Sequence, residues 1–145
     1  MKDLTTFGHM LITIDIGNTR IKMGLFDGSR LVENETFVLS EVEKAVKVYE
    51  QWFASGDRSI GIASGALDAH WPKSIRWLTI DDPWPFSIDY KTPESLGLDR
   101  LLFAAAAWLE NRVDLIVVVA GTCITYNIVK NDAFIGGAIS PGWAM

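Results

Sequence analysis

The residues from Asp15 to Thr19, followed by Lys22, have the types and spacing of a site for phosphate and Mg²⁺. Gly17 lacks a Cβ, so the backbone can turn tightly there and present its amides to anionic oxygens. Asn18 and Thr19 add side-chain hydrogen bonds. Asp15 would hold Mg²⁺ directly or through water, and Lys22 would place a point charge near the same phosphates. An ordinary hairpin with an Asn-Thr turn is the alternative.

Predicted strands on both sides of this turn would hold it at one end of a sheet. β-type runs occupy residues 10–16 and 21–26, and a third covers 30–38. Asp27-Gly28 is typical of the hairpin turn that joins the last two runs. We therefore expect the fold to open with three antiparallel strands.

Two helices are predicted from apolar residues that recur at helical spacing. They cover residues 41–54 and 98–111. Ser40 and Glu43 have the spacing of a capping box at the start of the first helix. Between the helices, short apolar runs over 59–63 and 75–80 predict buried parallel strands.

The end of the chain repeats the opening pattern of strand, glycine turn and two further strands. The repeat comprises a strand over 115–119, a turn at Ala120-Gly121-Thr122, and strands over 123–129 and 133–138. A two-lobed phosphate-binding fold would show such a repeat, because one glycine turn from each lobe would clasp the same nucleotide. The second turn therefore adds Gly121 and Thr122 to the candidate phosphate site.

The composition narrows the classes of function. With 145 residues, of which 49% are hydrophobic and 21% charged, the chain is long enough for one well-packed globular core. The net charge of −5, without a cluster of Lys and Arg, argues against nucleic acid as the main partner. The longest apolar stretches, 101–109 and 115–120, fall short of the roughly 20 residues that a membrane helix needs, so no membrane segment is expected.

The single cysteine, Cys123, excludes an internal disulfide and favours a reducing compartment, so a cytoplasmic location is expected. Because Cys123 falls within a predicted strand, we expect a small buried side chain there. Residues 1–9 carry one basic residue and no apolar segment, and are expected to form an N-terminal extension rather than a signal peptide.

Five motifs, in this order along the chain, resemble those of type III pantothenate kinase. They are Asp15 to Thr19, Tyr90 to Pro93, Gly97 to Arg100, Gly121-Thr122 with Thr125, and Gly136 to Gly142. The resemblance implies an α/β fold of the actin-like, hexokinase-like ATPase class (ribonuclease H-like), with the first lobe complete and the second only begun. It places the first lobe over residues 10–112, after the extension, and the opening strands of the second lobe over 113–145.

The resemblance also assigns residues to two binding sites. The ATP site would comprise Asp15, which places Mg²⁺, and Gly17, Asn18, Thr19, Lys22, Gly121 and Thr122. The pantothenate site would comprise Tyr90, Gly97, Leu98, Asp99 and Arg100. Asp99 would accept the proton of the pantothenate hydroxyl, and Arg100 would pair with a substrate carboxylate or a phosphate oxygen. From the residues alone, a solvated acid beside a surface base in a first helical turn is the alternative.

Two positions depart from the family's pattern. Val119 stands where the family usually has an acid that helps to hold an activating monovalent cation, so the expected K⁺ or NH₄⁺ would lose a ligand here. Asn127 stands where an acid commonly closes the next strand, although its side chain keeps an oxygen.

The resemblance further implies that family members continue after the Pro141-Gly142 turn. We therefore expect the strand at 116–119 to lack a covering layer, to expose apolar surface and to favour self-association. We also expect these 145 residues alone to be an inefficient kinase.

Three functions follow from the sequence. The first is a homodimeric kinase that uses MgATP to phosphorylate pantothenate, the first step of coenzyme A synthesis. The second is a non-catalytic relative with a regulatory role, as in the Bvg accessory factor proteins of the same family. The third is a generic actin-like ATP-binding module, which would have no reason to keep Tyr90 or the residues from Gly97 to Arg100. The residues alone indicate only an ATP-dependent phosphotransferase acting on a small hydroxylated substrate.

Overall fold

The computed structural model describes residues 10–54, 57–64, 67 and 70–142, and the predicted extension over 1–9 lies outside them. Within those residues, no helix is long and apolar enough to cross a membrane. Contacts divide the chain into two compact units, Met1–Leu78 and Thr79–Met145. They thus group residues 79–112 with the last three strands, whereas the sequence suggests a lobe boundary after residue 112. The lobe assignment stays a prediction.

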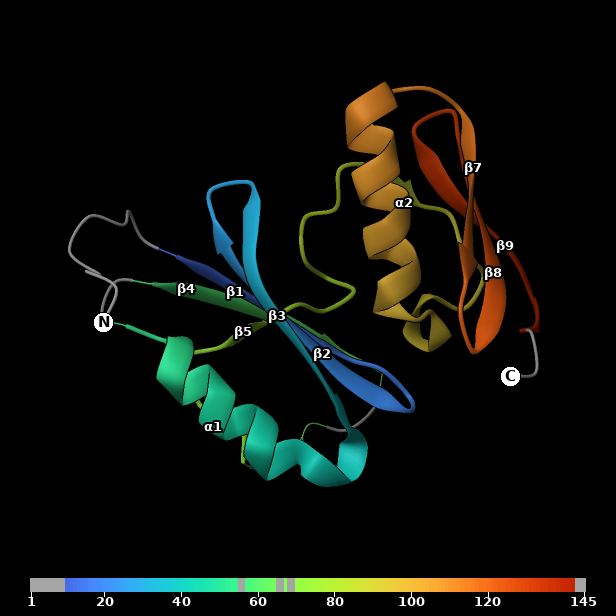
Figure 1. Ribbon diagram of the computed structural model, residues 1–145. Helices are drawn as coiled ribbons and strands as arrows, with labels where there is room; N and C mark the ends of the chain where they lie inside the picture. The colour runs from blue at the N-terminus through green and yellow to red at the C-terminus, as the bar shows by residue number, and fades with distance from the viewer. Residues whose placement is uncertain (1–9, 55–56, 65–66, 68–69, 143–145) are drawn as a thin grey trace. The chain divides into compact units, whose positions relative to one another are not determined.

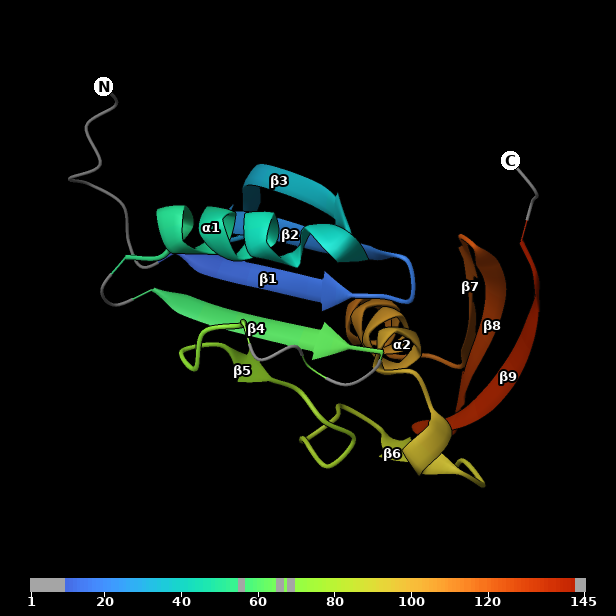
Figure 2. The ribbon, with the colours of Figure 1, turned by 90° about the horizontal axis from the view of Figure 1, so that it is seen from below.

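The first unit is a five-stranded sheet in the order β3-β2-β1-β4-β5, covered by one helix (Figure 1). Its strands are β1 (Leu11–Ile16), β2 (Arg20–Asp27), β3 (Arg30–Val38), β4 (Arg58–Ala63) and β5 (Arg76–Trp77). A 3₁₀ turn, η1 (Leu39–Glu41), leads into the helix α1 (Val42–Trp52). The first three strands are antiparallel, as predicted. Strands β4 and β5 run parallel to β1, which the runs over 59–63 and 75–80 also predicted. Figure 2 shows α1 lying along the strands.

Alternate side chains of β1 and β2 form the core of this unit. Ile12 and Ile14 of β1 are buried, and so are their cross-strand partners Leu25 and Met23 of β2. Tyr49 of α1 is buried in the same cluster. The period of two along the strands therefore creates one apolar face, and α1 seals it.

The start of α1 differs from the expectation. Glu41 is the residue before the helix, and no side chain caps the helix there, so the capping box predicted from Ser40 and Glu43 is wrong. Instead, the Val38 amide donates to Glu41 Oε2 over 3.4 Å. Lys44 lies 2.7 Å from Glu41, and its hydrogen bond lowers the pKa of that carboxyl, with help from the Val38 amide.

Strand β5 is shorter than the strand predicted over 75–80. Its ladder to β4 ends at Trp77, whose ring lies within 2.5 Å of the position that a Cβ on Gly61 would take. Two residues later the Thr79 amide donates to Asp82 Oδ2 over 2.7 Å. This local side-chain bond offers the backbone an alternative to the sheet, so the apolar run does not continue as a strand.

The second unit is a four-stranded sheet in the order β6-β9-β8-β7, packed against the helix α2 (Figure 1). Its elements are β6 (Ser87–Ile88), the 3₁₀ turn η2 (Pro93–Ser95), α2 (Leu98–Asn111), β7 (Leu115–Ala120), β8 (Cys123–Lys130) and β9 (Ala133–Pro141). The antiparallel strands β7, β8 and β9 confirm the predicted repeat of the opening strand pattern. The sequence did not predict β6, because two residues are too few to show a period.

The two faces of this second sheet differ in burial. Val129 and Phe134, on the face toward α2, are fully buried in one cluster with Leu101 of the helix. On the opposite face, Ile116 and Val118 of β7 are exposed. The apolar surface predicted to be exposed at residues 116–119 is therefore confirmed for β7.

Cys123 is exposed, so the prediction of a buried thiol is wrong. It is the first residue of β8 and follows the exposed turn residue Thr122. A residue at the first position of a strand lies at the rim of the sheet, where neighbouring side chains cover it on fewer sides than in the middle.

Candidate functional site

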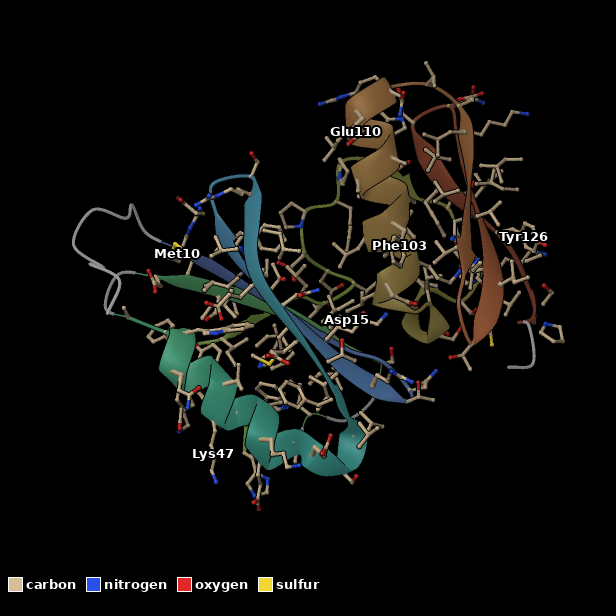
Figure 3. All side chains as sticks on the ribbon, viewed as in Figure 1. Met10, Asp15, Lys47, Phe103, Glu110 and Tyr126 are labelled. Atoms are coloured by element: carbon tan, nitrogen blue, oxygen red, sulfur yellow. The ribbon has the colours of Figure 1, made fainter. Side chains whose placement is uncertain are left out.

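The first glycine turn joins β1 to β2, with an ion pair beside it. Asp15 and Lys22 are cross-strand partners, and Lys22 Nζ lies 3.9 Å from Asp15 Oδ2. The Gly17 amide donates to the carbonyl oxygen of Arg20 over 2.9 Å, which closes the turn. Figure 3 labels Asp15. The acid, the base and the glycine of the predicted phosphate site thus meet at one end of the first sheet.

The side chains of this turn are open to a ligand. Asn18 and Thr19, at the tip of the turn, are exposed. The side chains of Lys22 and Asp15 are 64% and 35% exposed, so solvent screens their pair. An anion can therefore compete for the Lys22 ammonium at little cost.

Ser64, the residue after the strand predicted over 59–63, also lies beside this turn. Its amide donates to the carbonyl oxygen of Ile16 over 2.8 Å, because β4 runs parallel to β1 and both strands end here. Parallel neighbours bring their carboxyl ends to the same edge of a sheet. Applied to the strand predicted over 59–63, that rule would have placed Ser64 near Asp15.

Helix α2 begins at the predicted motif from Gly97 to Arg100. Gly97 is the residue before the helix, with φ −63° and ψ 127°, and Leu98 is the first helical residue. A Cβ on Gly97 would lie 2.5 Å from Asp99 Oδ1, so the Asp99 carboxylate lies over the glycine. Leu98 and Asp99 are partly exposed. The acid therefore stands in the first turn of the helix, a place that favours acidic side chains.

Arg100 is buried, and its guanidinium binds the sheet of its own unit. Nε donates to Asn127 Oδ1 over 2.7 Å, and Nη2 donates to the carbonyl oxygen of Tyr126 over 3.2 Å. Asn127, fully buried, donates in turn to Thr125 Oγ1 over 3.2 Å. These bonds anchor the first turn of α2 to β8.

Asn127, which stands where the family commonly has an acid, is the residue that accepts the hydrogen bond from Arg100 Nε. An acid at this position would form a buried ion pair with the guanidinium, whereas asparagine keeps the hydrogen bond without the opposite charge. Across the described part of the chain, no acid forms an ion pair with Arg100. The two residues are 27 positions apart and no local pattern links them, so the contact cannot be predicted from the sequence pattern.

Tyr90 lies against β9 at a glycine. Its ring centroid is 6.4 Å from that of Phe134. A Cβ on Gly136 would lie 2.8 Å from two atoms of the Tyr90 ring, and the φ of Gly136 is +99°. Gly136 thus supplies both the left-handed backbone and the space that the ring fills. Tyr90 is partly exposed, so part of the residue remains accessible to solvent.

The second glycine turn joins β7 to β8. The Gly121 amide donates to the carbonyl oxygen of Cys123 over 3.0 Å, and the Gly142 amide donates to that of Thr122 over 3.2 Å. The structure thus joins two of the predicted motifs. Val119 lies two residues before Gly121 and has no side-chain oxygen.

Each unit by itself gathers part of the candidate site. The first holds Asp15, Gly17, Asn18, Thr19 and Lys22 together. The second brings Arg100 to Asn127, Tyr90 to Gly136, and Thr122 to Gly142. Among the residues that the structure describes, no group of three or more His, Cys, Asp or Glu could hold a metal. One carboxylate such as Asp15 fits Mg²⁺ where substrate phosphates supply the other ligands.

The strand order and the repeated glycine turn define the class of protein, the actin-like ATPase fold predicted from the sequence. A solved structure described as a proposed Baf family transcriptional activator from Campylobacter jejuni is similar, with a TM-score of 0.54 and 23% identity, over 90% of this chain and 54% of that chain. The solved structure of a proposed 2-dehydro-3-deoxygalactonokinase from Sinorhizobium meliloti is similar with a TM-score of 0.50 and 11% identity. The match covers 91% of this chain and 53% of that chain. These likenesses confirm the fold.

Sequence comparison narrows the class to a family. A profile of type III pantothenate kinase matches residues 57–145. The type III pantothenate kinase of Flavobacterium johnsoniae is 39% identical over an alignment of 141 residues that covers 92% of this chain and 58% of the relative. The type III pantothenate kinase of Christiangramia forsetii is 35% identical over an alignment of 144 residues that covers 94% of this chain and 59% of that relative. The chain belongs to the type III pantothenate kinase family and spans less than two thirds of the length of these relatives.

Proposed function

We propose that this protein is a kinase that transfers the γ-phosphate of ATP to pantothenate and yields 4′-phosphopantothenate, in the first step of coenzyme A synthesis. Beside the family membership, the observation that carries the proposal is the first turn of α2, where Asp99 is partly exposed and Arg100 ties the turn to β8. A fixed carboxylate suits phosphoryl transfer, which depends mostly on positioning and on neutralising charge.

In this proposal Asp99 accepts the proton of the substrate. The pantothenate hydroxyl oxygen bonds to the γ-phosphorus while the bond from that phosphorus to the β–γ bridging oxygen breaks. ADP leaves, and the hydroxyl proton passes to the Asp99 carboxylate. Tyr90, Gly97 and Leu98 line the substrate. Arg100 has five N–H groups, of which two bind the sheet, and the others are proposed to hold a substrate carboxylate or a phosphate oxygen.

The two glycine turns are proposed to bind ATP. Asp15 would hold Mg²⁺, which neutralises phosphate charge when it is bound. The phosphates would also contact Gly17, Asn18, Thr19, Lys22, Gly121 and Thr122. We propose weak activation by K⁺ or NH₄⁺, because Val119 supplies no ligand. The family resemblance supports a homodimer, and the single cysteine supports a cytoplasmic location.

A coupled assay of ADP release with ATP, Mg²⁺ and pantothenate tests this function. We expect slow turnover that depends on pantothenate, and Asp99→Asn should lower it roughly 10²- to 10⁴-fold because the proton acceptor is lost. Glu110→Gln removes an exposed acid at the other end of the same helix and is the matched control. Calorimetric titration with MgATP should give the same affinity for all three proteins. Equal turnover in Asp99→Asn would contradict the assignment.

A second candidate is a non-catalytic relative with a regulatory role, which Val119 favours. The same assay, run with and without K⁺ on the native chain and on Val119→Asp, separates the two candidates. Cation-stimulated turnover in Val119→Asp supports the kinase. MgATP binding without turnover in both proteins supports the non-catalytic relative and contradicts the kinase.

A further inference from the structure

The buried guanidinium of Arg100 is bound to β8 along one edge only. Nε donates to Asn127 Oδ1 and Nη2 donates to the carbonyl oxygen of Tyr126, and these two nitrogens share one edge of the planar group. Nη1 bonds no residue that the structure describes. The fork formed by Nη1 and Nη2 therefore keeps N–H groups for a ligand.

This fork reaches the surface although the side chain that carries it is packed. Arg100 is 7% exposed. Within residues 10–54, 57–64, 67 and 70–142, every buried side-chain nitrogen or oxygen has a hydrogen-bond partner. Because Nη1 has none, it is not one of the buried atoms, and solvent reaches it.

Asn127 holds the guanidinium through a fully bonded amide. While its Oδ1 accepts from Arg100, its Nδ2 donates to the carbonyl oxygen of Val117 over 3.4 Å. Nδ2 also donates to Thr125 Oγ1 over 3.2 Å. Val117 belongs to β7, the last strand of the sheet in the described part of the chain, so the far edge of β7 is open there. A carboxylate at position 127 could accept from Arg100 but has no N–H for the other two bonds.

The positive charge of Arg100 has no counter-ion among the described residues. Both of its hydrogen-bond acceptors are neutral amide oxygens, and the carboxylate of the neighbouring Asp99 lies over Gly97 instead. A charge in a packed environment interacts more strongly with a charged ligand than it would in water. The group that would balance this charge is an oxyanion, which a guanidinium fork binds through two parallel bonds.

We propose that Asn127 is a positioning residue that prepares Arg100 to bind an oxyanion. It orients the guanidinium and leaves the full charge to two oxygens of a carboxylate or phosphate group, which accept from Nη1 and Nη2. Aspartate at position 127 would hold the same edge, but its charge would repel the ligand. Only the identity of the ligand rests on the proposed function, in which the oxyanion belongs to pantothenate or to ATP.

Calorimetric titrations of the 145-residue chain test this role. The ligands are pantothenate, an uncharged analogue with a hydroxymethyl group in place of the carboxylate, and MgATP. Asn127→Asp should weaken binding of pantothenate or of MgATP at least about tenfold, because a negative charge is added beside the guanidinium. The ligand that is weakened carries the oxyanion. The affinity for the uncharged analogue should change less than about twofold.

Asn111→Asp is the matched control, because it makes the same change at an exposed asparagine of α2 and should leave all three affinities unchanged. The inference is overturned if Asn127→Asp binds pantothenate and MgATP as tightly as the native chain does. It is also overturned if the uncharged analogue is weakened as much as the charged ligands, since a merely structural role would have that effect.

An NMR titration separates failure of this inference from failure of the proposed function. The probes are formate and inorganic phosphate, and the signal is the Nε–H resonance of Arg100. At least one probe should shift it to saturation in the native chain, with an affinity at least about tenfold lower in Asn127→Asp. If this holds while pantothenate and MgATP do not bind, the kinase is contradicted and the role of Asn127 is supported. A resonance that neither probe shifts would overturn the inference.

If Asn127→Asp does not fold, Thr125→Asp takes its place in both measurements. Its carboxylate would accept from Asn127 Nδ2 and bring a negative charge near the same guanidinium, so oxyanion affinity should fall at least about threefold. Unchanged oxyanion affinity in Thr125→Asp would overturn the inference.

Discussion

The two glycine-turn sheets have the same strand pairing and different chemistry. Next to the first turn, Asp15 and Lys22 pair across the strands, whereas Val119 and Thr125 hold the equivalent positions in the second. One turn is therefore flanked by an acid and a base, and the other by an aliphatic and a hydroxyl side chain. In both sheets the alternation of side chains along the strands and the glycine turn determine the backbone pairing. The chemistry of each turn depends instead on the cross-strand pair of side chains beside it.

The same comparison separates strand formation from burial. Strand β7 keeps its apolar residues and its full pairing with β8 although Ile116 and Val118 are exposed. Apolar β-branched residues pair well on a pleated surface whether or not a layer covers them. Helix α1 covers the face that holds Ile12 and Ile14, whereas the equivalent face with Ile116 and Val118 is exposed, and the stability that this cover adds can be measured.

The largest effect is expected from one substitution made at equivalent positions. Ile12→Ala should lower the free energy of unfolding by about 3 kcal/mol, because it leaves a cavity under α1. Ile116→Ala should lower it by less than about 0.5 kcal/mol, because the side chain is exposed. Urea-induced unfolding of both variants checks the comparison, and equal losses would show that the two faces are covered alike.

The next effect concerns the buried bond between α2 and β8. Asn127→Leu should cost about 2 kcal/mol, because the Arg100 guanidinium loses its acceptor inside the fold. Asn127→Asp should cost less, because an ion pair replaces the hydrogen bond. The equivalent position of the first sheet is Gly24, so that sheet has no such contact.

Asn111→Leu is the control for this pair, because it makes the same change at an exposed asparagine of α2. It should change stability by less than about 0.5 kcal/mol. Thermal unfolding measures all three variants. If Asn127→Leu is no worse than Asn111→Leu, the contact with Arg100 does not stabilise the second unit.

A smaller effect is expected at Gly136. Gly136→Ala should cost about 1 to 2 kcal/mol, because φ is +99° and the Tyr90 ring fills the place of the new methyl group. The equivalent residue of the first sheet is Glu33, whose carboxylate accepts from Trp52 Nε1 over 3.1 Å at the surface. Glu33→Ala should therefore cost less than about 1 kcal/mol. Equal losses in guanidinium titrations would argue against the role of the ring.

The smallest effect on stability is expected at the ion pair beside the first turn. Lys22→Met should change the free energy of unfolding by less than about 0.5 kcal/mol, because the pair is exposed. The same variant should weaken MgATP binding about tenfold, since a charge near the phosphates is lost. Lys130→Met, on an exposed lysine of β8, should change neither quantity. Calorimetry measures both, and unchanged ATP affinity in Lys22→Met would remove Lys22 from the site.

The sequence predicted what depends on local pattern. The second helix was expected over 98–111 and spans Leu98–Asn111, because its apolar spacing and the glycine before it are both local signals. The strands around both glycine turns were predicted for the same reason. Asp15 and Lys22 lie on the two strands of one predicted hairpin, so their proximity was also predicted.

What the sequence did not predict depends on distant contacts. Arg100 bonds a residue of another strand, and Tyr90 fills a space left by a distant glycine. The burial of Cys123 was misjudged because strand membership does not say how close a residue lies to the rim of its sheet. The length of β5 was misjudged because one side-chain bond, from Thr79 to Asp82, ended an apolar run that the pattern would have continued.

The open edge of β7 has a practical consequence for handling the protein. Leu115–Ala120 is a six-residue apolar run with no charge, proline or glycine, the composition of segments that stack into cross-β aggregates. Loss by precipitation should therefore rise with protein concentration, even at temperatures where both units remain folded. Dilution, or a lysine placed on this strand, should extend the shelf life of the sample more than a tighter core would.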